Sequence, residues 1–230
     1  MDKIAVSHLY PKDFRFSEAM KTLRTNLVFS GPSIRAIAIT SFGAAEGKST
    51  ISLQVALAFA QTGKRVLLVD ADMRKSVLPN RLRVKGKVEG LSHYLSGLAN
   101  VSELLCETDV PGMYIMFSGT RVPNSAELLG SENFAKLIPA LKEVFDYIIV
   151  DTAPLGQVID CAVVAQHLDG VAMVVDTTKN SYKLERRVKN QIIKAGGKVL
   201  GVILNQIDIK QQAYYYGYGK RYGGYYTSEE

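Results

Sequence analysis

Three consecutive residues, Gly47-Lys48-Ser49, have the types and order that bind the phosphates of a nucleotide. An alternating apolar run at residues 34–39 predicts a strand before them, and an amphipathic run as far as residues 62–63 predicts a helix after them. In such a loop the backbone N–H groups hold phosphate oxygens, the lysine adds a positive charge and the serine hydroxyl reaches Mg²⁺. We therefore predict a phosphate-binding loop made of Gly43, Ala44, Ala45, Glu46, Gly47, Lys48, Ser49 and Thr50.

The loop is a variant of the usual phosphate-loop pattern. The usual pattern has a glycine five residues before Gly47, and this chain has Phe42 there. A turn of small residues that contains Gly-Lys-Ser by chance is the alternative, but the flanking strand and helix favour phosphate binding. The other motifs must decide which variant is present.

Three acidic residues stand where apolar runs end. Asp70 ends the run Val66–Val69, Asp72 follows two residues later, and Asp151 ends the run Ile148–Val150. Magnesium prefers carboxylates together with phosphate oxygens and water, and a hydroxyl that accepts a phosphoryl group must lose its proton. One such acid would be explained as a helix cap, whereas three beside a phosphate loop predict a catalytic site.

Apolar runs alternate with helical patterns along most of the chain. We expect strands at residues 34–39, 65–70, 113–117, 147–150, 171–175 and 199–204, and helices at residues 17–29, 48–62, 91–97, 132–144, 158–167 and 182–195. Residues 1–16 are expected to be irregular and residues 71–90 to be rich in loops. The alternation predicts an α/β fold with a mostly parallel sheet flanked by helices, whose ligands lie at the carboxyl ends of the strands.

Composition narrows the class of protein. The chain has 230 residues, of which 47% are hydrophobic, and no linker rich in proline and serine, so we expect one domain over residues 1–210. Its two cysteines lack metal-ligand spacing, and no signal peptide or membrane span is apparent, which predicts a soluble intracellular protein. The net charge of +6 suits an anionic partner, but we expect no nucleic acid, because no motif that reads bases is present.

Part of the positive charge is concentrated after the second predicted strand, where two interpretations stay open. A solvated loop and an anion-binding surface are both compatible with this cluster, which consists of Arg74, Lys75, Arg81, Arg83, Lys85 and Lys87.

Residues 211–230 differ from the rest of the chain. They contain no Leu, Ile, Val or Phe, so they cannot bury enough apolar surface to offset the entropy of ordering, and we expect a disordered tail. Seven of the twelve tyrosines lie here: Tyr214, Tyr215, Tyr216, Tyr218, Tyr222, Tyr225 and Tyr226. The alternative is a low-complexity end without a specific role.

Together these stretches resemble the bacterial tyrosine kinases of capsular and exopolysaccharide synthesis, and the resemblance covers nearly the whole chain. The matching segments are Thr40-Ser41-(five residues)-Gly47-Lys48-Ser49, Leu68-Val69-Asp70-Ala71-Asp72-Met73-Arg74 (Walker A′), Ile148-Ile149-Val150-Asp151-Thr152-Ala153-Pro154 (Walker B), Gly201-Val202-Ile203-Leu204-Asn205 and the tyrosine-rich tail. The Asp-x-Asp-x-Arg segment and the tail are the specific part, because many ATPases share the loop.

The resemblance implies a P-loop kinase that uses ATP and Mg²⁺ and phosphorylates its own tail tyrosines, in trans between subunits. It assigns Lys48 to the phosphates, Asp70 to the proton of the tyrosine, and Asn205 to adenine. Ser49, Asp72 and Asp151 would hold the metal, and Asp72 would also serve catalysis or the contacts between subunits. It further implies a homo-oligomer such as a ring, a separate membrane-bound activator that recruits the kinase to the inner face of the membrane, and a cognate tyrosine phosphatase.

Two departures from the family pattern carry expectations. Ala44-Ala45 replaces the usual Pro-Gly, and alanine disfavours a positive φ that glycine reaches easily, so we expect weaker nucleotide binding or turnover if position 45 needs it. The family's oligomerisation motif Glu-x-x-Arg-x-x-Arg appears as Glu18-x-x-Lys21-x-x-Arg24, and lysine cannot reproduce a bidentate arginine contact. A solvated charged helix face is the alternative for these residues.

Two other functions are alternatives to a tyrosine kinase. A division-site or partition-type (MinD- or ParA-like) ATPase would carry a signature lysine at position 43, where this chain has Gly43, and would lack the tyrosine tail. A non-catalytic ATP-binding adaptor would use the tail to dock partners, and Ala44-Ala45 would then mark lost turnover.

Overall fold

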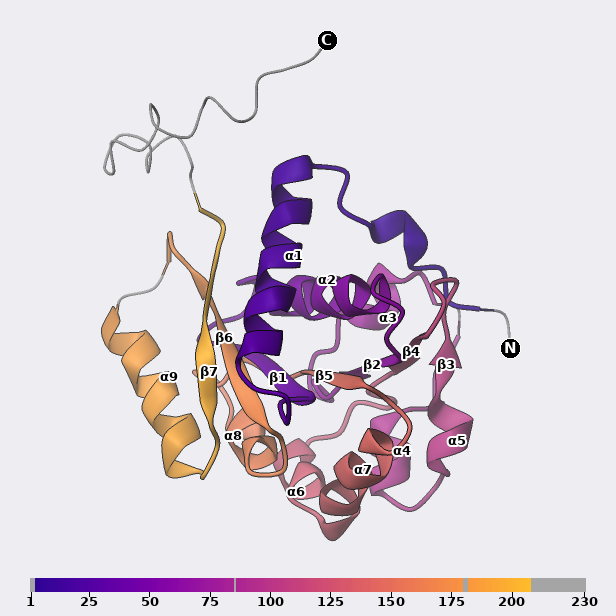
Figure 1. The fold of residues 1–230 in the computed structure, drawn as a ribbon. Coiled ribbons are helices and arrows are strands. Elements are labelled where there is room, and N and C mark those ends of the chain that lie inside the picture. Colours follow the sequence, from indigo (N-terminus) through magenta and orange to yellow (C-terminus); the bar gives the residue numbers. More distant parts are fainter. Residues whose placement is uncertain (1–2, 85, 180–181, 208–230) are drawn as a thin grey trace, which may run out of the picture.

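The computed structural model describes residues 3–84, 86–179 and 182–207. Figure 1 shows a seven-stranded sheet with helices on both of its faces. The strands are β1 (Ala36–Ser41), β2 (Val66–Asp70), β3 (Cys106–Glu107), β4 (Met113–Met116), β5 (Tyr147–Asp151), β6 (Gly170–Asp176) and β7 (Val199–Asn205), in the order β3-β4-β2-β5-β1-β6-β7. Every pairing is parallel except that of β3 with β4, so the predicted α/β class is confirmed.

Ten helical elements are described along the chain. They are the 3₁₀ turn η1 (Ser7–Leu9) and the helices α1 (Phe14–Phe29), α2 (Lys48–Ala60), α3 (Leu78–Arg81), α4 (Leu91–Leu95), α5 (Val101–Leu104), α6 (Ser125–Leu129), α7 (Glu132–Lys142), α8 (Asp160–Ala165) and α9 (Tyr182–Lys194). In the residues that the structure describes, no helix is long and apolar enough to cross a membrane.

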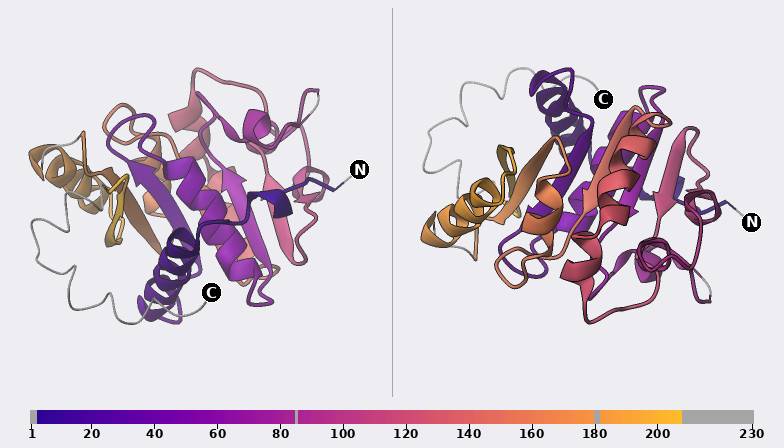
Figure 2. Two further views of the ribbon diagram at one scale, coloured as in Figure 1. Left: turned by 90° about the horizontal axis from the view of Figure 1, so that it is seen from above. Right: turned by 90° about the horizontal axis from the view of Figure 1, so that it is seen from below.

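The central strands are buried on both faces because helices cover each side of the sheet. Every residue of β1, β2 and β6 is buried, as expected for apolar runs in a parallel sheet. Helices α1 and α2 pack on one face of the sheet, and α4 to α9 contribute to the core on the other face. Figure 2 shows the molecule from above and from below, so each view looks onto one of these faces.

Several sequence predictions were wrong at particular places. The first long helix begins at Phe14 rather than Ser17, because the Asp13 side chain caps it by accepting a hydrogen bond from the backbone N–H of Phe16 at 2.8 Å. Helix α2 is not amphipathic, since Thr50 is its single residue that is not buried. The short elements η1, α3, α5, α6 and β3 were not predicted, because two to five residues show no period.

The remaining predicted elements are present with boundaries that differ by a few residues. Helix α7 continues through Pro139, as expected, and Gly31 at φ 137° follows the end of α1. The predicted domain boundary at residue 210 and the whole tyrosine-rich tail lie outside the described residues.

Candidate active site

The phosphate loop connects the end of β1 to the start of α2 and has an unusual backbone. Gly47 precedes α2 with φ 93°, and Ala45 has φ 59°, in the left-handed region. Alanine at position 45 is expected to be unfavourable if that position needs a positive φ, and the structure meets this condition. A non-glycine residue in this conformation costs about 1–2 kcal/mol, so the loop carries local strain.

Side chains from within the loop and from β7 hold it in this shape. Glu46 is buried and accepts a hydrogen bond from the backbone N–H of Gly43 at 2.8 Å. The Asn205 side-chain amide donates to the carbonyl of Glu46 at 2.9 Å. A Cβ at Gly47 would overlap that amide, so the close approach requires glycine. Asn205 therefore supports the loop, and its adenine contact stays a prediction.

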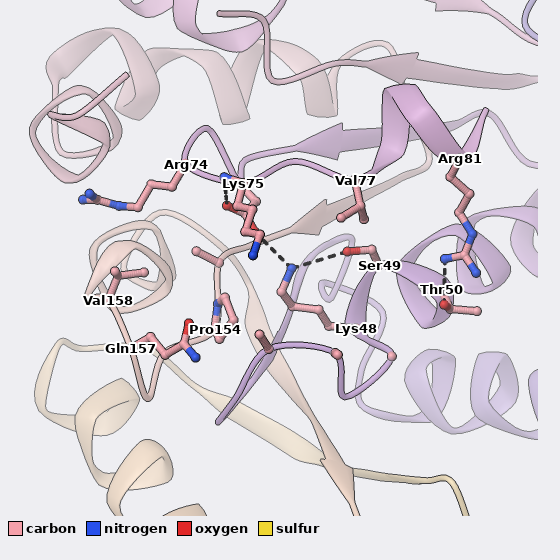
Figure 3. Close-up of a pocket in the computed structure, with 15 residues that line it drawn as sticks. Lys48, Ser49, Thr50, Arg74, Lys75, Val77, Arg81, Pro154, Gln157 and Val158 are labelled. Carbon is pink, nitrogen blue, oxygen red and sulfur yellow. Dashed lines mark hydrogen bonds and ion pairs between the residues drawn. The ribbon is translucent and has the colours of Figure 1, made fainter. Parts of the chain in front are cut away.

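Lys48 is the first residue of α2 and lies among acidic side chains. Its ammonium group is 3.2 Å from Asp72 Oδ2 and 4.0 Å from Asp151 Oδ1. It is also 3.4 Å from the hydroxyl of Ser49, a contact that Figure 3 marks. Burial acts to lower the pKa of Lys48, but Asp151 and Asp72 outweigh it and raise the pKa, so the group stays charged. Its side chain is only 10% exposed, so the lysine is largely shielded from solvent.

Asp151 lies close to Lys48 and accepts a hydrogen bond from a serine that was not predicted from the sequence. The Ser52 hydroxyl, one turn into α2, donates to Asp151 Oδ1 at 3.0 Å. Burial raises the pKa of Asp151, and the charge of Lys48 opposes that rise. The sequence could have indicated Ser52, because it lies four residues after Lys48 and residues four apart share a helix face.

Asp70 lies at the end of β2, directly beside Asp151 at the end of β5 in the strand register. It is fully buried, and its carboxylate accepts hydrogen bonds from the Ser76 hydroxyl and from the backbone N–H of Asp72, the latter at 3.2 Å. Burial, with a contribution from the charge of Asp151, raises the pKa of Asp70 to about 7. A carboxylate with that pKa is suited to accept a proton near neutral pH.

A cleft of about 320 Å³ opens beside the phosphate loop. Lys48, Ser49 and Asp72 line it, whereas the buried Asp70 and Asp151 do not. Figure 3 shows Lys48 near the centre of this cleft, with Lys75 above it, Arg81 toward the right, and Pro154, Gln157 and Val158 toward the left. Arg81 donates to the Thr50 hydroxyl at 2.7 Å, so this part of the basic cluster contacts the phosphate loop. The cleft is also lined by the phosphate-loop residues Ala44, Ala45 and Gly47.

Arg74, the arginine of the Asp-x-Asp-x-Arg segment, is held by another acid. Its guanidinium makes two hydrogen bonds to Asp160, at 2.9 and 3.1 Å, and one to the carbonyl of Pro123 at 3.1 Å. Asp160 is buried at the start of α8 and also accepts from the Ser125 hydroxyl at 2.7 Å. This arginine therefore fixes the Walker A′ segment to α8 and is not a free cation of the basic cluster. Lys85, of the same cluster, lies outside the described residues.

The residues predicted to hold Mg²⁺ come together at one edge of the sheet. Ser49, Asp72 and Asp151 all lie near the Lys48 ammonium group. Together with Asp70, the two aspartates make three carboxylates around a single lysine, so acidic groups outnumber basic ones here. Within the described ranges, no group of three or more His, Cys, Asp or Glu side chains is arranged to hold a metal by itself. The residues present fit Mg²⁺, which is bound through one or two carboxylates with phosphate oxygens and water.

The predicted oligomer contacts lie on α1. Lys21 and Glu18 form an ion pair at 2.6 Å on the surface. Arg24 instead reaches the carbonyl of Ala58 in α2 at 3.0 Å and is half-buried. The three side chains therefore differ in availability, and their role between subunits stays a prediction.

Comparisons with known proteins agree with this geometry. Residues 34–194 match the family described as the AAA domain. The tyrosine-protein kinase CpsD of Streptococcus agalactiae is 41% identical over 217 residues, which cover 91% of this chain and 95% of that protein. Two solved structures match at 30% identity: the chimerical protein CapA2B2, with a TM-score of 0.81 over 90% of this chain and 95% of that one, and the kinase domain of Escherichia coli tyrosine kinase ETK, with a TM-score of 0.78 over 82% and 74%.

Proposed function

The chain belongs to the family of bacterial tyrosine-protein kinases, and we propose that it transfers the γ-phosphate of ATP to the tyrosines of its own tail. The observation that carries this proposal is the position of Asp70. The buried carboxylate of Asp70 has a pKa of about 7 and lies next to Asp151 in the sheet. Asp72, which forms the ion pair with Lys48, follows it by two residues in the sequence. Water and a tyrosine hydroxyl must each lose a proton when they attack the γ-phosphate, so Asp70 could serve either acceptor. The similarity to the tyrosine-protein kinase CpsD and the seven tyrosines of residues 211–230 favour tyrosine as the acceptor.

In the proposed reaction the tyrosine oxygen attacks the γ-phosphorus, the bond from that phosphorus to the bridging oxygen of ADP breaks, and the phenolic proton passes to Asp70. Lys48 and the N–H groups of the loop bind the phosphates and stabilise the charge that develops. Ser49, Asp72 and Asp151 would hold Mg²⁺, which neutralises phosphate charge when bound.

Binding of the nucleotide requires Lys48 to change partners. Its ammonium group now contacts Asp72 at 3.2 Å, and a phosphate above the loop would compete for it. When Lys48 turns to the phosphates, Asp72 becomes free for the metal. This exchange keeps each buried charge paired in both states, which limits the cost of desolvation.

We propose that transfer occurs between subunits. The described chain ends at Ile207 near the carboxyl edge of the sheet, and a tail of some 15 residues reaches on the order of 50 Å when extended. Tail phosphorylation would add roughly −10 to −14 charge and reverse the net +6, so phosphorylated subunits are expected to separate. The unmodified subunits would associate as a ring or smaller oligomer through the α1 face of Glu18, Lys21 and Arg24.

The wider setting of the activity follows from the family resemblance. We propose that the kinase works on the inner face of the membrane through a separate membrane-bound activator, that a tyrosine phosphatase reverses its modification, and that the cycle controls capsular or exopolysaccharide synthesis and export. The high identity to CpsD over nearly the full length of both chains supports this setting.

The activity is tested by incubating the purified full chain with ATP and Mg²⁺ and measuring phosphotyrosine. Direction of transfer is tested by mixing a Lys48→Met chain with a catalytic chain whose tail tyrosines are all phenylalanine. We expect phosphate on the Lys48→Met chain. An active wild-type control together with an unlabelled Lys48→Met chain would instead indicate transfer within one chain, and a wild type without phosphotyrosine would favour the adaptor function.

A further inference from the structure

Helix α9 presents a row of cationic and amide side chains to solvent. The row consists of Lys183, Arg186, Arg187, Asn190, Gln191 and Lys194, which line one shallow hollow. Their spacing of three and four residues places them on one flank of the helix over about 16 Å. The opposite side buries Val188 and Ile192 in the core, so the helix is fixed to the sheet by its apolar face.

Carboxylates neutralise some of the cations elsewhere in the structure. Arg74, Lys142 and Lys179 each have a carboxylate partner at 2.9 Å or less. In the described part of the chain, no ion pair involves Lys183, Arg186, Arg187 or Lys194. Four exposed positive charges within three turns repel one another, so this flank of α9 favours an anionic ligand with several charges.

We propose that this cationic row of α9 binds the phosphorylated tyrosine tail of the same protein. Figures 1 and 2 show α9 beside β7 at one end of the sheet, and Figure 1 shows that α9 begins toward the end of the sheet where β7 finishes. Tyr214 lies seven residues after Ile207, the last described residue, and seven residues span on the order of 20 Å when extended. The first tyrosines of the cluster are therefore within reach of the row.

The charge of the tail makes this binding depend on phosphorylation. Residues 208–230 contain three acidic residues, Asp208, Glu229 and Glu230, and three basic residues, Lys210, Lys220 and Arg221, so their side chains sum to zero. Each phosphate adds about −1.5 to −2. The planar guanidinium groups of Arg186 and Arg187 suit bidentate contact with phosphate oxygens, and the flanking lysines add point charges.

An anionic membrane is the other ligand that a basic helix can suggest, and the structure favours the tail. A helix that lies in a membrane interface inserts its apolar face among the lipids. The apolar face of α9 is occupied by the sheet, since Val188 and Ile192 are fully buried. The proposal takes the source of the phosphates from the proposed function, and it adds a site that retains the product away from the catalytic cleft.

The test uses the full, unphosphorylated chain and a fluorescent synthetic peptide of residues 211–220 that carries phosphotyrosine at Tyr214, Tyr215, Tyr216 and Tyr218. Fluorescence anisotropy measures binding to wild type, to Arg186→Gln/Arg187→Gln, and to Lys189→Gln/Lys198→Gln. The second double variant also removes two exposed positive charges but lies outside the hollow. We expect the arginine variant to bind about tenfold more weakly and the lysine variant to stay within about twofold of wild type.

Equal weakening in both variants would show a general charge effect and overturn the proposal. So would unchanged binding in the arginine variant, which would place the peptide in the cleft, or equal binding of the unphosphorylated peptide. If the peptide does not bind but vesicles of phosphatidylglycerol and phosphatidylcholine sediment wild type and not the arginine variant, the row is a membrane surface. Because the peptide is phosphorylated chemically, a chain without kinase activity would still give this result, so the two proposals fail separately.

Discussion

Helices α2 and α9 both have thirteen residues and both carry positive charge, but they stand in opposite environments. Helix α2 is buried on all sides except at Thr50, and its lysine lies among three carboxylates at the ends of β2 and β5. Helix α9 buries two residues and exposes its basic side chains. Positive charge is therefore desolvated and paired in one helix, where we propose a catalytic role, and exposed in the other, where we propose a binding surface.

Substitution of the α2 lysine is expected to have the largest effect. Lys48→Met should lower phosphotyrosine formation by about 10³-fold, since the cation that holds the phosphates is lost. It should also destabilise the fold by about 3–5 kcal/mol near pH 8, because Asp72 and Asp151 lose their buried partner. Calorimetry at pH 8 and pH 5 measures this, and we expect the deficit to shrink at pH 5 because burial raises the pKa of Asp151 and favours its protonated form. An equal deficit at both pH values would mean that Asp151 is not charged in wild type.

The second prediction concerns the pH dependence of stability. The pKa of Asp70 is about 7 in the folded chain against an ordinary 3.8, so the folded state binds the proton more tightly than the unfolded state. The stability that this proton contributes is complete below about pH 4 and is lost as pH rises to about 7. Asp70→Asn removes the titrating group and should flatten this decline by a few kcal/mol, measured by urea unfolding from pH 4.5 to 8. Parallel pH curves for the two proteins would contradict the burial of a charged Asp70.

A third prediction tests the strain of the phosphate loop. Ala45→Gly should stabilise the chain or its nucleotide complex by about 1 kcal/mol, because glycine adopts φ 59° without a Cβ clash. Ala44→Gly is the matched control, since Ala44 has no positive φ and should gain nothing. Thermal unfolding with and without ADP measures both. A similar gain in the two variants would point to general loop flexibility.

The smallest effect is expected on α9. Lys194→Met repeats the chemistry of the first substitution at an exposed position without an ion pair in the described residues. The free energy of unfolding should change by about 0.5 kcal/mol or less. A loss comparable to that of Lys48→Met would remove the contrast between the two helices.

Features that depend on a local sequence pattern, such as strands and the acids that follow them, could be predicted from the sequence. Apolar runs ended by Asp70 and Asp151 predicted both the buried strands and the acids at one edge of the sheet. The missing glycine raised a positive φ at position 45 only as a condition, and the structure shows that the condition is met. The order of strands, which places β5 between β2 and β1, is a tertiary property that no local pattern contains. For the same reason the partners Ser52, Ser76 and Asp160 were missed, since their contacts depend on how distant segments pack. The prediction that α2 is amphipathic was wrong, because a helix buried on all sides has no polar face.

The central claim is that the γ-phosphate of ATP passes to a tail tyrosine at this site, with Asp70 taking the phenolic proton. The most direct measurement follows radiolabelled ATP into the full chain, locates the label after proteolysis, and compares wild type with Asp70→Asn. The account predicts label on phosphotyrosine in residues 211–230 and a loss of about 10² or more in rate for the variant. Label confined to other residues, or an Asp70→Asn chain that labels its tail at the wild-type rate, would contradict it.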